Sequence, residues 1–165
     1  MSQLFFNEVE AAKIAQNMEK NGLEFYRKAA ARTKDVAVRD LFLKLADDEK
    51  GHLARFEELE ETLQAERRDQ AGYVDDHEIA AYIDRLLQTQ VFGAAGDVAR
   101  LAEQAADDVE ALGVGMKAER DSILFYQEML DFVDSKAAKT AFASILKEER
   151  QHLRLLGERS EDCGS

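Results

Sequence analysis

The 165-residue sequence contains no proline, no tryptophan and one cysteine. Without proline, helices can continue uninterrupted, and the abundance of Ala, Leu, Glu, Lys and Arg favours long helices over a sheet. The single cysteine, Cys163, has no partner for a disulfide within the chain and cannot form a Cys-x-x-Cys metal site. We therefore expect an all-α protein in a reducing compartment, the cytoplasm.

The sequence also lacks an excess of positive charge and long apolar runs. Its 22 basic and 34 acidic residues give a net charge of −12, which argues against nucleic acid or an anionic membrane surface as a partner. No stretch approaches the roughly 18 apolar residues of a membrane span. The N-terminus lacks the basic and apolar regions of a secretion signal. A soluble protein that is not exported is expected.

One pattern of acidic, aromatic and imidazole side chains occurs twice in the chain. In the first half, a glutamate is followed by a tyrosine seven residues later and by a Glu-x-x-His segment thirty residues later. The second half repeats this pattern at an offset of 100 residues, which indicates an internal duplication. The pattern consists of Glu19, Tyr26, Glu49, His52, Glu119, Tyr126, Glu149 and His152.

On a helix, these spacings bring ligand atoms together. Residues three apart lie on one face, so each Glu-x-x-His segment can offer an oxygen and a nitrogen to one centre. Residues seven apart are separated by two turns, which places each tyrosine one layer from its glutamate. Four helices with these faces inward would enclose four carboxylates and two imidazoles. Buried charges without partners each cost several kcal/mol, so we expect two divalent cations among them.

Helical periodicity and polar breaks divide the chain into a repeated hairpin and a connection. We expect one domain over residues 1–165, with hairpin one at about 4–66, a crossover at about 67–106 and hairpin two at about 107–158. The short connection within each hairpin makes its two helices antiparallel. The expected fold is a four-helix bundle of two duplicated hairpins joined by a crossover helix.

Local signals predict where individual helices begin and end. Asp35 and Ser135 follow short polar connections at equivalent places in the two hairpins, and each is expected to cap the next helix. One crossover helix is expected over 76–92, where apolar residues recur at helical spacing. The tail after Gly157 is expected to be short, polar and frayed.

The duplicated motifs resemble those of the ferritin-like di-iron carboxylate proteins and, within them, the rubrerythrins. In this family, one glutamate from each of two helices and a Glu-x-x-His segment from each of the other two hold the metals. The resemblance covers roughly residues 4–156, with all six ligand positions filled in order. It implies two iron ions per chain, with terminal carboxylates at Glu19 and Glu119, bridging carboxylates at Glu49 and Glu149, and imidazole ligands at His52 and His152.

The resemblance also implies a function. Tyr26 and Tyr126 would donate hydrogen bonds to the ligand carboxylates and orient them. The family oxidises a ferrous pair with hydrogen peroxide or dioxygen, so a peroxidase-type oxidoreductase is expected. Strict rubrerythrins carry a rubredoxin domain with four cysteines, whereas this sequence has one cysteine. A separate electron-donor protein is therefore expected, together with a homodimer as the assembly.

One position departs from the rubrerythrin pattern. Those proteins usually carry a further glutamate three residues after the third-helix ligand, where this chain has Ser122. The departure affects the redox-linked movement of iron that is associated with peroxide reduction. The equivalent position in the first half is Gly22. Two small residues at these places either let the helices approach closely or leave room for peroxide or dioxygen, and the sequence leaves both interpretations open.

Other features also have two interpretations. A lone Glu-x-x-His segment is most often a solvated ion pair, and it is the duplication that favours metal ligation. Zinc could replace iron, because nitrogen and oxygen ligands bind it more tightly than ferrous iron. Tyr26 and Tyr126 could be core residues whose hydroxyls reach some acceptor. Asp48 and Glu148 directly precede the Glu-x-x-His segments, and they could either support a histidine on the partner helix or lie on a solvated face.

A second class of function also stays open. The chain could be a non-catalytic iron-binding or iron-storage protein, in which ferroxidase chemistry only loads a mineral. Storage requires a hollow shell of many subunits, whereas an oxidoreductase does not need such an assembly. The rubrerythrin-like motifs and the crossover helix favour the oxidoreductase.

Overall fold

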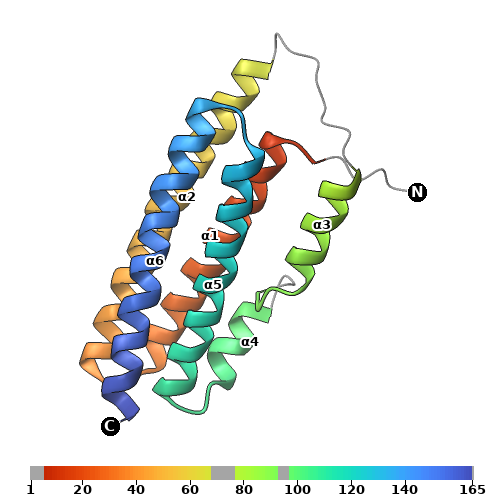
Figure 1. Ribbon diagram of the computed structural model, residues 1–165. Coiled ribbons are helices and arrows are strands. Elements are labelled where there is room, and N and C mark those ends of the chain that lie inside the picture. The colour runs from red at the N-terminus through yellow and green to blue at the C-terminus, as the bar shows by residue number, and fades with distance from the viewer. Residues whose placement is uncertain (1–5, 68–76, 93–96, 165) are drawn as a thin grey trace.

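A computed structural model describes residues 6–67, 77–92 and 97–164 (Figure 1). Within these ranges every element is a helix, so the expected all-α fold is confirmed. None of these helices has an apolar stretch long enough to cross a bilayer. The helices are α1 (Glu8–Arg32), α2 (Val36–Arg67), α3 (His77–Gln88), α4 (Asp97–Gln104), α5 (Asp108–Phe132) and α6 (Lys136–Gly164).

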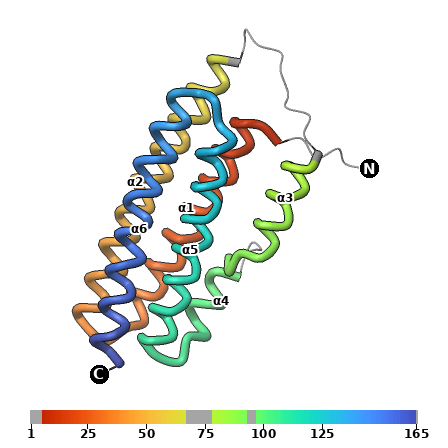
Figure 2. The backbone as a smooth tube through the Cα atoms, viewed as in Figure 1, coloured from red at the N-terminus to blue at the C-terminus, as the bar shows by residue number. Residues whose placement is uncertain are grey.

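Two helical hairpins form the bundle. Helix α1 packs against α2, and α5 packs against α6. The hairpins meet through two further contacts, α2 with α6 and α1 with α5, so the four long helices enclose one common interior (Figure 2). The crossover runs outside the bundle, where α4 packs against α1. The predicted architecture is confirmed.

The same capping positions recur in the two hairpins. The side chain of Asn7 accepts from the backbone N–H of Glu10 at 2.9 Å and begins α1. At the equivalent place, Asp107 accepts from the N–H of Glu110 at 2.8 Å and begins α5. Caps of this kind satisfy N–H groups that have no partner within the helix. They fix where each ligand-bearing helix starts.

The second helix of each hairpin has the cap that was expected. Asp35 accepts from the backbone N–H groups of Ala37 and Val38 at 2.9 and 3.2 Å. The hydroxyl of Ser135 accepts from the N–H of Ala138 at 3.4 Å. The carboxylate is the stronger acceptor of the two and makes the shorter contacts.

The crossover differs from the expected single helix over 76–92. Helix α3 ends at Gln88, and two turn hydrogen bonds follow it at residues 89 and 90. A second helix, α4, was not predicted. It forms because Val98 and Ala102 bury one face against the bundle core, and because Arg32 donates to backbone carbonyl oxygens at its C-terminal end. Residues 93–96 lie outside the described ranges.

The expectation of a frayed tail after Gly157 is wrong, because α6 continues to Gly164. A glycine inside a helix costs about 1 kcal/mol relative to alanine. Packing on either side of it offsets this cost. Leu156 is fully buried, and Cys163, one residue before the end of the helix, packs against the same core cluster.

The core consists of two clusters, and the predicted ligand positions of every long helix lie between them. Each cluster contains a layer of aromatic side chains. The Tyr126 layer consists of Phe56, Tyr126 and Phe142, and the Tyr26 layer consists of Phe25, Tyr26 and Phe42. Within a layer the ring centroids lie 5.2–6.5 Å apart, which suits attractive aromatic contacts. These layers separate the centre of the bundle from its two ends.

Replacing Phe142 by alanine should reduce the free energy of unfolding by about 3–5 kcal/mol, the usual loss for a buried aromatic ring. Phe142 is fully buried against Phe56 and Tyr126. Urea unfolding followed by circular dichroism measures the change. Leu124→Ala on α5 is the control, since Leu124 is 42% exposed. It should change stability by less than about 0.5 kcal/mol. Equal effects of the two substitutions would contradict the assignment of the layer.

Candidate metal centre

All six predicted ligands lie together at the centre of the bundle. Each of the four long helices contributes one glutamate, and α2 and α6 each add a histidine. Their exposures range from 0% to 4%, values that charged residues seldom have unless they are paired or bind metal. The buried residues are Glu19, Glu49, His52, Glu119, Glu149 and His152.

The six side chains form two overlapping groups. One group contains Glu19 and His52, and the other contains Glu119 and His152. Glu49 and Glu149 belong to both groups. In each group the candidate ligand atoms lie within 4.8 Å of one another. Two neighbouring positions that share two carboxylates are the arrangement expected for a bridged pair of cations.

The two imidazoles lie parallel between the carboxylates. Their ring centroids are 5.5 Å apart, with an interplanar angle of 19°. His52 Nδ1 lies 2.8 Å from an oxygen of Glu149 and 3.4 Å from one of Glu19. His152 Nδ1 lies 3.4 Å from an oxygen of Glu119. Both Nδ1 atoms therefore point at the carboxylate cluster.

Seven side-chain atoms in this cluster are buried without a hydrogen-bond partner among the described residues. His52 Nδ1 and Glu149 Oε1 are among these seven atoms although they lie 2.8 Å apart, because their contact does not have the geometry of a hydrogen bond. Leaving a buried polar atom without a partner costs about 1–3 kcal/mol, and more for charged groups. Five carboxylate oxygens and two imidazole nitrogens facing one centre fit divalent cations such as iron or zinc. The atoms are Glu19 Oε2, Glu49 Oε1, His52 Nδ1, Glu119 Oε2, both Oε atoms of Glu149, and His152 Nδ1.

The outer nitrogen of each imidazole contacts a carboxylate from the opposite hairpin. His52 Nε2 lies 2.6 Å from Glu148, and His152 Nε2 lies 3.0 Å from Asp48. A hydrogen bond at Nε2 places the proton there and leaves Nδ1 free to bind a metal. The two carboxylates therefore support the histidines, and of the two interpretations left open by the sequence the structure selects this one.

Two basic residues hold these supporting carboxylates. Lys44 donates to Asp48 at 2.6 Å, and Arg55 donates to Glu148 at 3.0 Å. Burial would raise the pKa of both acids, but hydrogen bonds and charges of the bases and the histidines outweigh it and lower the pKa. The carboxylates stay ionised and can accept from the imidazoles. Sequence reasoning missed both bases, although Lys44 is four residues from Asp48, the spacing of a helical ion pair.

The tyrosine hydroxyls donate to ligand carboxylates across the bundle. Tyr26 donates to Glu119 at 2.6 Å, and Tyr126 donates to Glu19. Each tyrosine thus donates to the glutamate of the other hairpin. The sequence had placed each tyrosine one layer from the glutamate of its own helix. Burial first, and then the charge of the acceptor, raise the pKa of both phenols, so they remain protonated donors.

The pKa values of the carboxylates shared by both groups are raised when no cation balances them. Burial raises the pKa of Glu49 and Glu149 well above the usual value, and the neighbouring carboxylates raise it further. Burial alone would lower the pKa of His52, but hydrogen bonds and charges from Glu19 and Glu148 outweigh it and raise the pKa. In each case the shift favours the protonated form, which reduces the excess negative charge.

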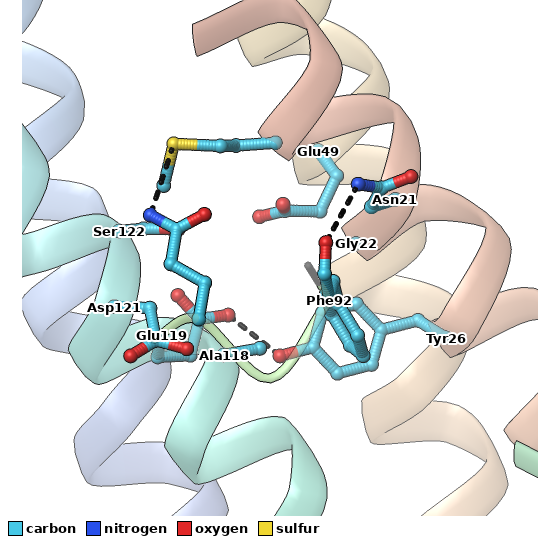
Figure 3. Close-up of a pocket in the computed structure, with 11 residues that line it drawn as sticks. Asn21, Gly22, Tyr26, Glu49, Phe92, Ala118, Glu119, Asp121 and Ser122 are labelled. Atoms are coloured by element: carbon cyan, nitrogen blue, oxygen red, sulfur yellow. Dashed lines mark hydrogen bonds between the residues drawn. The ribbon is translucent and has the colours of Figure 1, made fainter. Parts of the chain in front are cut away.

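Gly22 makes room for one of the shared carboxylates. A Cβ atom built on Gly22 would lie 2.5 Å from Glu49 Oε2 and 3.3 Å from Glu49 Cδ. Any other residue at this position would displace the Glu49 side chain. Gly22 therefore gives room to a candidate ligand carboxylate, a role that the sequence did not predict. Its counterpart, Ser122, lines a small cavity beside Glu49 and Glu119 (Figure 3).

Comparisons with known proteins agree with this geometry. Residues 4–60, about a third of the chain, match the family model described as Rubrerythrin. No curated protein matches the sequence. A solved DUF305 fragment from Deinococcus radiodurans is 15% identical with a TM-score of 0.67, and it covers 94% of this chain and 95% of its own. A hypothetical protein from Pyrococcus furiosus is 23% identical with a TM-score of 0.66, over 94% and 89%. At these identities the solved structures show the shared fold alone.

Gly22→Ala should weaken metal binding by about tenfold or more, because a displaced shared carboxylate loses at least one charge-assisted contact. Metal content after dialysis against buffered metal, together with titration calorimetry, measures the change. Gly51→Ala is the matched control, since a Cβ at this helical glycine meets no atom within 4 Å. It should keep metal binding and slightly stabilise the helix. Full metal affinity in Gly22→Ala would contradict the role of Gly22.

The pH dependence of stability should reverse when metal is added. The raised pKa values of Glu49, Glu149 and His52 mean that the metal-free folded chain holds protons that the unfolded chain releases. Its stability should therefore fall as pH rises above the ordinary glutamate range. Metal requires deprotonated carboxylates, so its stabilising effect should grow with pH. Unfolding at about pH 5 and about pH 8, with and without divalent metal, measures both trends. Identical profiles for the two forms would contradict a buried metal centre.

Proposed function

We propose that this rubrerythrin-like chain is a di-iron oxidoreductase that reduces hydrogen peroxide or dioxygen. The observation that carries the proposal is the pair of overlapping buried ligand groups, which share Glu49 and Glu149. A protein that only binds single ions would need no such sharing, because independent sites could each hold one ion. The rubrerythrin match over the first hairpin supports iron as the metal.

Each residue of the centre has a distinct role under this proposal. Glu49 and Glu149 would bridge the two ions because they alone belong to both groups. Glu19 and His52 would complete one position, and Glu119 and His152 would complete the other. Two divalent cations would balance the four carboxylates and provide partners for the seven buried atoms that have none among the described residues. Zinc could occupy the same positions, since the ligand atoms suit it equally well.

Two ferrous ions, when bound, supply two electrons together, which matches the requirement for cleaving an O–O bond. The protein prepares the site for this reaction. The tyrosines hold the carboxylates of Glu19 and Glu119 in place, and Asp48 and Glu148 hold the imidazoles. The aromatic layers at either end keep bulk water away from the carboxylates, which strengthens their interaction with cations.

The proposal includes a separate protein that returns electrons to the centre. The histidine side of the centre offers a route to the surface, because Asp48 and Glu148 contact the imidazoles and are themselves partly exposed. The net charge of −12 suits an electron donor with a complementary basic surface. A homodimer of the chain remains part of the proposal.

The purified chain reconstituted anaerobically with ferrous iron should bind two irons. Glu49→Ala or Glu149→Ala should lose both, because each carboxylate contacts both positions. Glu19→Ala should weaken one position only. Glu57→Ala, which removes an exposed carboxylate from the same helix as Glu49, is the control and should retain both irons. Metal analysis and Mössbauer spectroscopy measure the result. Full retention in Glu149→Ala would contradict bridging.

The same preparation distinguishes an oxidoreductase from a storage protein. An oxidoreductase should consume hydrogen peroxide or dioxygen in single-turnover stopped-flow experiments and then accept electrons for another cycle. A storage protein should instead accumulate iron well beyond two ions per chain and elute as a large shell in size-exclusion chromatography.

A further inference from the structure

A small cavity lies against the metal centre on the side opposite the histidines. Its volume is about 20 Å³, enough for one water-sized molecule. Helices α1 and α5 form most of its walls, and Gln90 and Phe92 at the end of the crossover cover part of its opening (Figure 3). The carboxylates of Glu49 and Glu119 reach into it, so a molecule held there would lie directly beside two proposed ligands.

The other sides of the centre are filled by side chains. The Tyr126 layer and the Tyr26 layer close the two ends. The stacked imidazoles of His52 and His152 fill the side formed by α2 and α6. On the side formed by α1 and α5, small side chains line part of the cavity, with Gly22 on one helix and Ala118 and Ser122 on the other. A small molecule can therefore approach the centre between α1 and α5, a boundary that we call the seam.

Residues 90–92 lie across the seam as a strap, and both hairpins hold it. Asp121 on α5 accepts from the backbone N–H of Val91 at 2.8 Å. Asn21, at the equivalent position on α1, donates to the backbone carbonyl of Phe92 at 3.5 Å. The Phe92 ring packs against Phe25 with centroids 5.3 Å apart. Asp121 thus accepts from a backbone N–H of the strap, and Asn21 donates to a backbone carbonyl of the strap. Together the two side chains can hold a backbone segment that lies between them.

The hydrogen bond from Val91 to Asp121 is the strongest of these contacts. It is short, and its acceptor is charged, which makes a hydrogen bond roughly twice as strong as a neutral one. The contact of Asn21 is at the limit of hydrogen-bond length, and that of Gln90 to the sulfur of Met18 is 3.7 Å. Opening of the strap should therefore depend mainly on Asp121.

We infer that the cavity is the entry and binding place of a small neutral oxidant, and that Asp121 restricts access to it by holding Val91. The inference rests on the proposed function for the identity of the oxidant, hydrogen peroxide or dioxygen. The strap, held in this place, narrows the opening and slows the passage of larger reductants and chelators to the centre. Asp121 acts through the strap and is a positioning residue.

Thiol labelling tests access without any metal reaction. In the full-length chain with Cys163→Ser, the substitution Ser122→Cys places one thiol in the cavity wall. Labelling by methyl methanethiosulfonate, a small neutral reagent, is followed by mass spectrometry. Adding Asp121→Ala should raise the labelling rate by about tenfold or more, because loss of a charge-assisted hydrogen bond shifts the opening equilibrium by that order. Asp121→Asn should restore slow labelling, since its side-chain oxygen can still accept from Val91.

Two controls separate strap opening from general loosening. Asp131→Ala removes an exposed carboxylate from α5 about 15 Å further along the helix and should leave labelling unchanged. A second reporter, Ala138→Cys, lies in the buried core and should stay slow when Asp121→Ala is added. Equal acceleration at both reporters, no acceleration at Ser122→Cys, or fast labelling in Asp121→Asn would overturn the inference.

The iron-loaded chain with its native Ser122 and Cys163 provides the second readout. Asp121→Ala should speed oxidation of the ferrous centre by hydrogen peroxide, and iron loss to a bulky chelator should accelerate with it. If labelling responds as expected but the chain binds no iron, the strap is established and the proposed function fails. If iron is bound and oxidised but Asp121→Ala does not change the labelling rate, the proposed function stands and the role of the strap is refuted.

Discussion

Negative charge buried at the centre is the constraint on which the rest of this structure depends. Four glutamates lie there with exposures of at most 4%, where water cannot screen them. The surrounding residues stabilise this negative charge in successive shells. Imidazoles face the carboxylates, tyrosine hydroxyls donate to two of them, and ionised acids outside support the imidazoles. The atoms left without partners converge on one place, where either protons or cations can complete the balance of charge.

The polar contacts around the centre also join the two hairpins. Tyr26 and Tyr126 connect α1 with α5, and the contacts of Asp48 and Glu148 connect α2 with α6. Each of these bonds crosses from one hairpin to the other. Apolar packing alone tolerates small shifts of one helix along another, whereas these directional bonds require one register. The residues that prepare the metal centre therefore also align the bundle.

The fold and the clustering of the six candidate ligands could be predicted because both rest on local spacing. Residues three and seven apart share a helix face whatever the helix packs against, and the repeat at 100 residues supplied the symmetry. The rubrerythrin resemblance seen in the motifs is confirmed by the match over 4–60. Contacts between helices were harder. The tyrosines cross to the other hairpin, and α4 and the last turns of α6 form because of tertiary packing around Val98 and Leu156, which no local pattern announces.

The crossing contacts have an evolutionary consequence. A lone hairpin of this type holds one partner of each tyrosine–glutamate and imidazole–carboxylate bond that crosses the bundle, so an ancestral half-length chain could complete these bonds only by pairing with an identical copy. After fusion of two gene copies, the two hairpins no longer need to have the same sequence. The ligands have stayed the same in both halves, while the seam has diverged, with Asn21 opposite Asp121 and Gly22 opposite Ser122. A symmetric pair of identical hairpins could not present a donor on one side of the strap and an acceptor on the other.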